Sequence, residues 1–570
     1  MQTVEELPVS FAKLPEPMPD TRVRFLDRIE RRTVLILIVI VAAAFSVRAY
    51  RLGAAGLAED ETHKIFAVRA YLRGDFTNNA EHPMLMKMLC LASLQGRALW
   101  NRIAAAGFGV SEEAAIRLPN AFFGALTVIP LFLLARSLFG FRTGLITSLM
   151  WAIGLNAMWF NRVAKEDTLL VFFMILGFYL YNHAKSRPEH DKRTQERSYA
   201  LAGAAFGLML SSKYFPHYLA LFHLYYYLAA YDGRNNRPLT KRMWARHYGA
   251  LLLTLFIFNF AIFSPQTWRY LWGYVNEDFQ THHGYLVMGR LYPNEISDTP
   301  GGSPWLFYWL YLAVKLPAPL IAAFVIGAVD VFRRRDAGAD TRGYLFLRVM
   351  LFSWLAPMCI VGSKFLRYTL GLIPFVYMAA AVGTILTYSY LRRSIRNADS
   401  GDRKRTWAWN RAAGAIAASG AALIFVAAPA GASLYHQENP GLFTNWIGGG
   451  RAGWFFPHDE FYDIGARESI KYLADNAQPG ARIASDIPGV VQYYLDKYNR
   501  KDIVPLAMSS LPLDGGNARF DFAIIQTGRI YFENRETIER IKKTCPAVQS
   551  SSFEGVVTSA VYSSRGPGLE

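Results

Sequence analysis

Apolar runs, each about 17–22 residues long, recur along roughly the first 430 residues of this 570-residue chain and are separated by short basic segments. A bilayer core about 30 Å thick requires helical segments of about this length. A soluble protein of this size would instead divide into several domains with frequent polar loops. The sequence therefore predicts a polytopic, mostly α-helical membrane protein, with candidate spans at residues 33–49, 116–136, 144–161, 168–184, 248–264, 316–332, 344–361, 369–390 and 411–430.

The net charge of the chain is +17, and 52% of its residues are hydrophobic while only 18% are charged. This composition excludes a disordered or fibrous chain. The basic residues gather between the apolar runs, which is typical of loops that orient a membrane protein and not of a nucleic-acid surface. We therefore expect no nucleic-acid partner, and a multi-pass protein of the cell inner membrane with a cytoplasmic N-terminus. The basic clusters lie at residues 31–32, 136–142, 185–197, 234–246, 333–342 and 392–411.

Residues 199–231 form one long apolar stretch between two basic, cytoplasmic segments, so they must cross the membrane an even number of times. We expect a hairpin whose arms are each only about 24 Å long, with a turn near Lys213. The total is then about eleven transmembrane helices, which leaves residues from about 432 onward on the outer side. Two long outer segments, 50–115 and 265–315, connect the spans.

The predicted domains are a transmembrane domain over residues 1–431 and a small extracytoplasmic α/β domain over residues 432–570. Periodicity in the second domain alternates between helical and strand patterns. The expected helices are 468–476, 490–497 and 536–543, and the expected strands are 482–485, 520–526 and 556–562.

Three adjacent acidic residues, Glu59, Asp60 and Glu61, follow the first span directly and precede a stretch with helical periodicity. Asp60 suits the N-cap of that helix, and it also suits an active-site carboxylate at the water–lipid boundary; the two roles are compatible. Asp167 lies at the outer mouth between the third and fourth spans and has the same two interpretations. Convergence of Asp60 and Asp167 on one site is our hypothesis.

Basic residues at outer span ends are unusual, because the positive-inside rule disfavours them. Each one alone is explained by snorkelling to lipid headgroups. As a set they suit a lipid phosphate or pyrophosphate. They are Arg117, Arg162, Lys213, Lys315, Lys364 and Arg367.

Several motifs in their order along the chain resemble glycosyltransferase family 39, which includes the protein O-mannosyltransferases; the lipid A aminoarabinose transferases are similar. The resemblance covers most of residues 33–390 and rests on Asp60-Glu61-Thr62-His63, Glu81 to Lys87, Arg117 to Gly124, Asn161-Arg162 to Asp167, Lys213, Trp305 to Pro317, and Arg367-Tyr368 to Pro374. Met84 stands where the family usually has a second proline, and His63 is closer to the protein mannosyltransferases, so the subfamily stays open.

The resemblance implies a C-type glycosyltransferase fold and transfer of a hexosyl or pentosyl group from a polyprenyl-phosphate donor on the extracytoplasmic face. By position, Asp60 matches the catalytic aspartate, Glu61 the acid on the acceptor side and Asp167 the second acid. Arg162, Lys213 and Arg367 fall where phosphate-binding cations are expected. The full set of expected substrate-binding residues is His63, His82, Lys87, Arg117, Arg162, Lys213, Lys315, Arg367 and Tyr368.

These residues suit an inverting displacement in which Asp60 removes the proton of the acceptor hydroxyl. A helix N-terminus lowers the pKa of such a carboxyl, whereas desolvation and neighbouring acids raise it, and the sequence leaves the balance open. The acceptor is also open between a protein hydroxyl, a lipid A phosphate and a polysaccharide.

No cofactor is certain. Glu81 with His282 or His283 allows a zinc-like divalent metal site, and a hydrogen-bonded structural histidine is the alternative. Two other functions compete with the enzyme: a secondary transporter, for which neither midplane charges nor an internal repeat is evident, and a membrane-anchored ligand sensor, which leaves the acids and outer cations unexplained.

Overall fold

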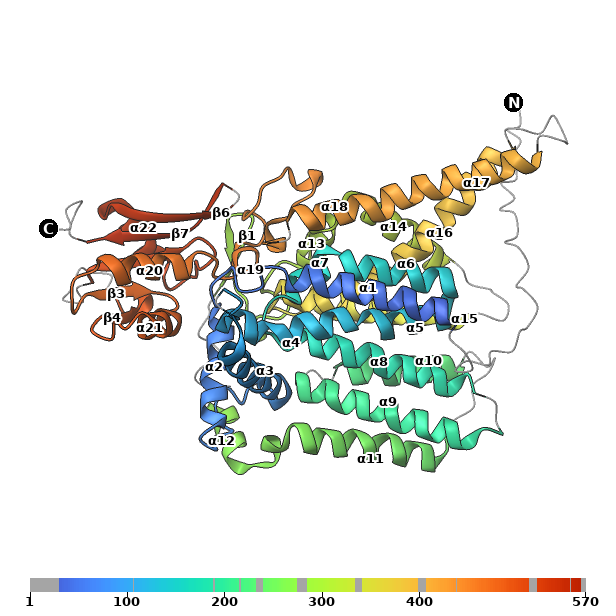
Figure 1. The fold of residues 1–570 in the computed structure, drawn as a ribbon, viewed down its shortest axis with the longest axis horizontal. Coiled ribbons are helices and arrows are strands. Elements are labelled where there is room, and N and C mark those ends of the chain that lie inside the picture. The colour runs from blue at the N-terminus through green and yellow to red at the C-terminus, as the bar shows by residue number, and fades with distance from the viewer. Residues whose placement is uncertain are drawn as a thin grey trace.

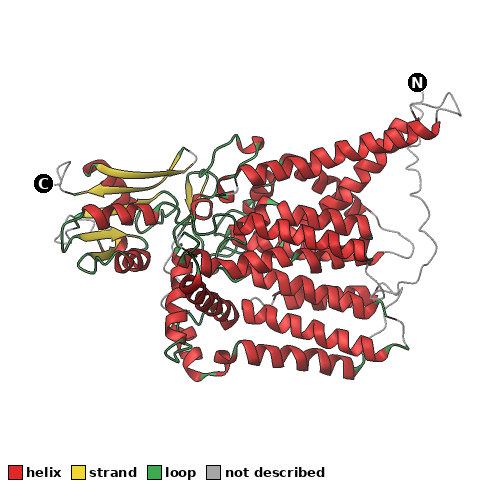
Figure 2. Ribbon diagram, in the orientation of Figure 1, coloured by secondary structure: helices red, strands yellow, loops and turns green. Residues whose placement is uncertain are grey.

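The computed structural model describes residues 30–564, except 106, 188–189, 215–216, 232–238, 274–283, 334–340, 398–405, 437, 512–519 and 554. Long helices lie side by side in a bundle, and a smaller domain with strands adjoins one end of it (Figures 1 and 2). The bundle helices are α1 (Arg31–Ala49), α4 (Glu112–Leu126), α5 (Val128–Phe139), α6 (Phe141–Ile153), α7 (Leu155–Phe160), α8 (Asp167–Lys185), α9 (Lys192–Ser212), α10 (His217–Tyr231), α11 (Lys241–Phe258), α14 (Ala318–Arg333), α15 (Thr341–Ile360), α16 (Ile373–Asn397), α17 (Thr406–Ala422) and α18 (Ala428–Tyr435).

Among the described residues, 6 helical segments are long and apolar enough to cross a membrane. They are Arg31–Ala49, Glu112–Phe139, Asp167–Lys185, Arg342–Ile360, Ile373–Ser394 and Gly414–Tyr435. The chain is thus a mostly helical integral membrane protein, as the sequence predicted. The count of about eleven spans stays a prediction, as does the domain boundary at residue 431.

The hairpin predicted over residues 199–231 corresponds to α9 and α10, and Lys213 follows α9 directly. Helix α9 is 21 residues long, or about 32 Å, which exceeds the expected arm length. It begins at Lys192, inside the basic segment, because the side chain of Asp191 accepts a hydrogen bond from the backbone nitrogen of Thr194 and caps the helix there. The polar residues therefore extend the helix beyond its apolar stretch.

Helices α14 and α16 approach each other closely through two glycines. A methyl group added to Gly327 would lie 1.8 Å from the carbonyl oxygen of Ala379, and one added to Gly383 would lie 2.0 Å from that of Ala323. Small residues allow such close backbone packing between membrane helices. This contact fixes α16, and the segment before α16 carries Arg367 and Tyr368.

The predicted outer segments fold into short elements at the end of the bundle that adjoins the smaller domain (Figure 1). They are α2 (Glu59–Tyr71), α3 (Met84–Ile103), the 3₁₀ turn Phe260–Phe263, α12 (Pro265–Gly273), the hairpin strands β1 (Tyr285–Val287) and β2 (Arg290–Tyr292), and α13 (Phe307–Lys315). A 3₁₀ turn over Leu366–Gly371 joins them between α15 and α16. Met288 and Gly289 both have positive φ, as a two-residue hairpin turn requires.

The smaller domain contains a five-stranded sheet in the order β4-β3-β5-β7-β6, with β4, β3 and β5 parallel and β7 and β6 antiparallel to their neighbours. Its elements are α19 (Pro457–Phe461), α20 (Ala466–Asn476), β3 (Arg482–Ser485), α21 (Pro488–Lys497), β4 (Val504–Ala507), β5 (Phe522–Gln526), α22 (Arg535–Thr544), β6 (Ala547–Phe553) and β7 (Val556–Ser563), with 3₁₀ turns at Pro440–Leu442, Trp446–Gly448 and Met508–Ser510. The α/β prediction is confirmed; strands β4 and β6 were not predicted.

Candidate functional site

Asp60 lies in the first turn of α2, between the helical bundle and the smaller domain. Its Oδ2 atom lies 2.7 Å from Nζ of Lys165 and 3.8 Å from Nη1 of Arg367. The hydroxyl of Tyr462 donates a hydrogen bond to the same oxygen at 2.9 Å. No hydrogen bond to Oδ1 of Asp60 is found among the described residues, and the side chain is 31% exposed. One carboxylate oxygen is thus held by three groups, while the other is available.

The electrostatics of this cluster resolve the balance that the sequence left open. Burial by itself would raise the pKa of Asp60, but Lys165 and Arg367, together with Lys64, outweigh burial and hold that pKa well below its usual range. Asp60 is therefore ionised at neutral pH. A carboxylate with so low a pKa is a weak base for as long as both cations remain beside it.

A second ion pair connects α2 to the loop before α8. Nζ of Lys64 lies 2.7 Å from Oε1 of Glu166, and both side chains are almost fully buried. Nδ1 of His82 lies 4.0 Å from the same oxygen. Burial lowers the pKa of His82 well below its usual value, so this imidazole is neutral. Glu166 was not among the predicted site residues, although it stands beside Asp167 in the sequence.

Asp167 and Lys213 meet in a small cavity next to Arg367. Nζ of Lys213 lies 2.6 Å from Oδ1 of Asp167 and 4.6 Å from the ring centroid of Tyr368. The guanidinium of Arg367 lies 5.6 Å from the centroid of that same ring. Oδ2 of Asp167 is buried without a hydrogen-bond partner among the described residues. The cavity is lined by Asp167, Leu170, Lys213, Tyr218, Tyr368 and Gly371.

The structure thus brings together five predicted residues, Asp60, Asp167, Lys213, Arg367 and Tyr368, from four separate segments. The ring of Tyr368, which both Lys213 and Arg367 approach, connects the Asp60 cluster to the Asp167 cluster. Two carboxylates and several cations at one end of the bundle match the hypothesis of a single site. The chemical role of each residue stays a proposal.

Glu61 is in a different environment from its neighbour Asp60. Its carboxylate is fully buried and accepts hydrogen bonds from Nε and Nη2 of Arg117, at 2.8 and 2.6 Å, and from the backbone nitrogens of Ala58 and Ala164, at 3.0 and 2.8 Å. Arg117 also donates to the carbonyl oxygens of Leu52, Ala55 and Gly56. This pair ties α2 to the end of α1 and to α4, and four donors already surround the Glu61 carboxylate.

Three other predicted cations contact carbonyl oxygens rather than an open space. Arg162 donates to the carbonyls of residues 47, 48 and 50 at the end of α1. Lys87 donates to those of residues 79 and 82. Lys315 donates to those of residues 441 and 443 and forms a buried ion pair with Glu460. These contacts hold segments around the site, and those of Arg162 satisfy carbonyls that the last turn of α1 leaves without partners.

The remaining predictions concern His63 and the metal site. His63 is exposed on α2. Glu81 accepts hydrogen bonds from Nδ2 of Asn79 and from the hydroxyl of Tyr270, the latter at 3.0 Å. His282 and His283 lie outside the described residues. Within the described part of the chain, no group of 3 or more His, Cys, Asp or Glu side chains is arranged to hold a metal ion.

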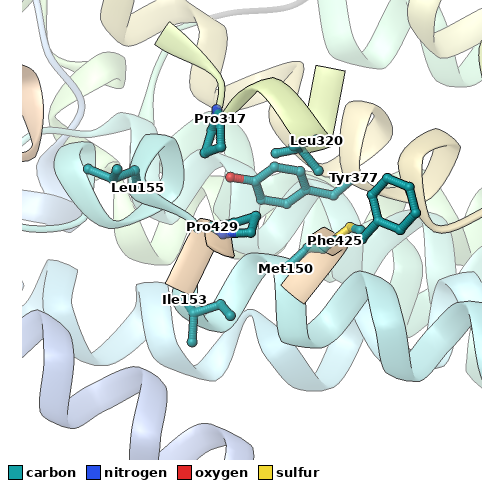
Figure 3. A pocket seen from close by; sticks show the side chains of 9 residues that line it. Met150, Ile153, Leu155, Pro317, Leu320, Tyr377, Phe425 and Pro429 are labelled. Atoms are coloured by element: carbon teal, nitrogen blue, oxygen red, sulfur yellow. The ribbon is translucent and has the colours of Figure 1, made fainter. Parts of the chain in front are cut away.

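Figure 3 shows a second cavity, which lies among α6, α7, α14, α16, α18 and a π-helical turn over Leu423–Ala427. Its lining residues are Met150, Ile153, Gly154, Leu155, Pro317, Leu320, Tyr377, Phe425 and Pro429. Tyr377 contributes the single polar side chain of this lining. The cavity therefore suits an apolar group, in contrast to the charged cluster around Asp60.

Comparisons with known proteins find a matching family model and solved structures of similar fold. Residues 98–263 match the family model described as dolichyl-phosphate-mannose-protein mannosyltransferase. The structure is similar to the crystal structure of ArnT from Cupriavidus metallidurans in the apo state, with a TM-score of 0.52 and 14% sequence identity over 94% of this chain and 98% of that chain. It is also similar to ArnT from the same organism bound to undecaprenyl phosphate, with a TM-score of 0.50 and 13% identity over 95% of this chain and 99% of that chain. No curated protein sequence matches the chain.

The chain therefore has the fold of the C-type membrane glycosyltransferases. Within that class, its residues 98–263 carry the sequence pattern of the dolichyl-phosphate-mannose-protein mannosyltransferases, which confirms the resemblance to glycosyltransferase family 39.

Proposed function

We propose that this chain is an integral membrane glycosyltransferase that moves a sugar from a polyprenyl-phosphate donor to a hydroxyl or phosphate group of an acceptor. The family model is named for an enzyme that uses dolichyl-phosphate mannose, and a solved structure with the same fold holds undecaprenyl phosphate. The acceptor is a protein, lipid A or a polysaccharide, and the sugar is a hexose or a pentose.

The observation that carries the proposal is the asymmetric environment of Asp60. Its Oδ2 is held by Lys165 and Tyr462, and its Oδ1 is available to accept a proton. In an inverting displacement, the acceptor hydroxyl attacks the anomeric carbon while a base removes its proton on the face opposite the leaving phosphate. We assign this role to Asp60, and we assign to Glu61 the positioning of α2.

The leaving polyprenyl phosphate gains negative charge as the glycosidic bond lengthens, and fixed cations stabilise that charge. Lys213 and Arg367, which both lie near the ring of Tyr368, are our candidates for this role. Asp167 holds Lys213 in place through the 2.6 Å ion pair. Arg162 takes no part, because its guanidinium contacts the end of α1.

The contact of Lys165 with Asp60 suggests how donor binding activates the base. In the structure, Lys165 and Arg367 both lie beside Asp60 and hold its pKa low. A donor phosphate attracts the same cations. Once one of them turns toward the phosphate, the pKa of Asp60 rises and the carboxylate becomes a stronger base in the presence of the donor.

We place the reaction on the extracytoplasmic face of the inner membrane, with the N-terminus in the cytoplasm. The basic clusters of the sequence support this orientation. The site adjoins the C-terminal domain at one end of the bundle (Figure 1), which supports a common side of the membrane for both.

Transfer of labelled sugar from a polyprenyl-phosphate donor in membranes tests the proposal, with wild type compared with Asp60→Asn. Asp75→Asn is the matched control, because Asp75 is exposed and caps a turn at Thr77 in the same outer segment. We expect transfer by the wild type and the control, and a loss of about 100- to 10,000-fold in Asp60→Asn. Equal transfer by all three would exclude Asp60 as the base. Absence of transfer by the wild type across donors and acceptors would refute the proposed function.

A further inference from the structure

The segment that leads from the last membrane helix to the sheet of the smaller, C-terminal domain enters the site. It contains α19 and the residues directly after it, Tyr462 and Asp463, which have φ values of 44° and 63°. Non-glycine residues rarely adopt this left-handed conformation, because the Cβ atom approaches the backbone. Two such residues in succession persist only where surrounding contacts hold them, and such positions cluster at functional sites.

The contacts that hold this turn come from the C-terminal domain. The carboxylate of Asp463 accepts hydrogen bonds from Nε and Nη2 of Arg529, at 2.8 and 2.7 Å, and from Nε2 of Gln526, at 3.1 Å. Gln526 ends strand β5, and Arg529 follows it. The turn is therefore fixed at the carboxyl end of the parallel strands.

Asp463 and Arg529 also bind the start of α2. The backbone nitrogen of Glu59 donates to Oδ2 of Asp463 at 2.9 Å, and Nη1 of Arg529 lies 2.6 Å from Oε2 of Glu59. Asp463 is buried and has four donors around its carboxylate. This arrangement clamps the residue before Asp60 to the C-terminal domain, and the hydroxyl of Tyr462 then meets Asp60 itself.

We propose that the C-terminal domain supplies Tyr462 as a positioning residue for the base Asp60, with Arg529 and Asp463 fixing its place. This inference rests on the proposed function. A carboxylate has two equivalent oxygens, and rotation about its last bond exchanges them. Because Tyr462 and Lys165 both contact Oδ2, they hold Oδ1 toward the acceptor. Without the hydroxyl of Tyr462, only Lys165 and the more distant Arg367 fix the orientation, and the carboxylate turns more freely.

Tyr462→Phe removes only the hydroxyl. Tyr472→Phe, on α20 of the same domain, is the matched control. We expect Tyr462→Phe to lower kcat about tenfold, because poorer orientation of the Asp60 carboxylate outweighs its gain in basicity. The KM for the donor should stay within about twofold, because no donor contact is lost. Arg529→Met should also lower kcat and leave the donor KM unchanged, because it removes the contacts that fix the turn at Tyr462 and Asp463.

A second measurement does not depend on turnover. A water-soluble carbodiimide reacts with protonated carboxyl groups, so its rate at Asp60, followed by mass spectrometry at pH 5, reports the protonated fraction. A hydrogen bond to the charged form lowers a carboxyl pKa, and its loss raises that pKa, which increases the rate about tenfold for each pKa unit. We expect faster labelling of Asp60 in Tyr462→Phe than in Tyr472→Phe. The other groups that face Asp60 are unchanged in both variants; they are Lys64, His82, Lys165, Arg367 and Asp459.

The outcomes separate the two proposals. If Tyr462→Phe has the kcat and the labelling rate of the wild type while Asp60→Asn is inactive, the role of Tyr462 is refuted and the proposed function stands. If the wild type transfers no sugar, the proposed function is refuted, and the labelling rate alone decides whether Tyr462 controls Asp60. A rise in donor KM with unchanged kcat would also overturn the positioning role.

Discussion

The contrast between Glu61 and Asp60 gives the sharpest prediction. The sequence assigned both residues to catalysis, but the Glu61 carboxylate is fully buried and has four donors, two of them from Arg117. Glu61→Gln removes the negative charge and leaves Arg117 buried without its counterion. Breaking a buried ion pair in this way costs about 3–5 kcal/mol of stability.

The size of the expected melting shift follows from the length of the chain. An unfolding entropy of about 2.1 cal/mol/K per residue gives about 1.2 kcal/mol/K for 570 residues that unfold cooperatively. A loss of about 3–5 kcal/mol then lowers Tm by about 3–4 °C. Asp60→Asn removes a counterion of the buried Lys165, so it should lower Tm as well, but by less, because the Asp60 side chain is 31% exposed.

The assay combines thermal unfolding in detergent with kcat measured per folded molecule. Glu61→Gln should lower Tm and retain most of its kcat, while Asp60→Asn should lower Tm by less and lose about 100- to 10,000-fold in kcat. If Glu61→Gln instead lost kcat with an unchanged Tm, Glu61 would belong to the chemistry and our assignment of a positioning role would be wrong.

Three further predictions concern the cations and the metal. Lys165→Met should move the acid limb of kcat/KM to higher pH, because Lys165 helps to hold the pKa of Asp60 low and its removal raises that pKa; a pH profile that does not move would contradict the ion pair. Arg367→Ala should raise the donor KM, whereas Arg162→Ala should lower Tm without changing the donor KM. If Arg162→Ala instead raised the donor KM and Arg367→Ala only lowered Tm, Arg162 would bind the donor and Arg367 would be structural. The metal site predicted at Glu81 requires that chelation lowers transfer and that zinc restores it, and full transfer in the chelator would exclude that site.

The sequence predicted the architecture well because membrane spans leave a strong signal in apolar length and charge asymmetry. The sequence singled out Asp60 and Asp167 because each lies at an outer span end within a family motif, and the structure places each next to a lysine. The cations were harder to sort. Lys213 and Arg162 have equivalent positions at outer span ends, yet one meets a carboxylate in a cavity and the other caps a helix.

Contacts between distant segments could not be predicted. Tyr462 lies 402 residues from Asp60 in the sequence and bears no motif of its own, although the acidic run from Asp459 to Asp463 is a signal that could have drawn attention to the segment. Lys165 and Glu166 stand beside Asp167 inside a motif that was recognised, but the local sequence does not show which of these three residues contacts the site. The structure shows it through their partners on α2: Lys165 pairs with Asp60, and Glu166 pairs with Lys64.

The position of Tyr462 has a consequence for biosynthesis. At about 5–20 residues per second, a ribosome makes Tyr462 about 20–80 s after Asp60, which precedes it by 402 residues. During that interval the nascent chain already contains the acidic first turn of α2, but lacks the turn at Tyr462 that orients Asp60. If the turn has the role proposed here, a chain released early, after its last membrane helix, would be inserted and inert. Catalytic competence would then begin only after the chain has been made as far as Arg529, which fixes the turn, and shorter nascent chains would not modify substrates.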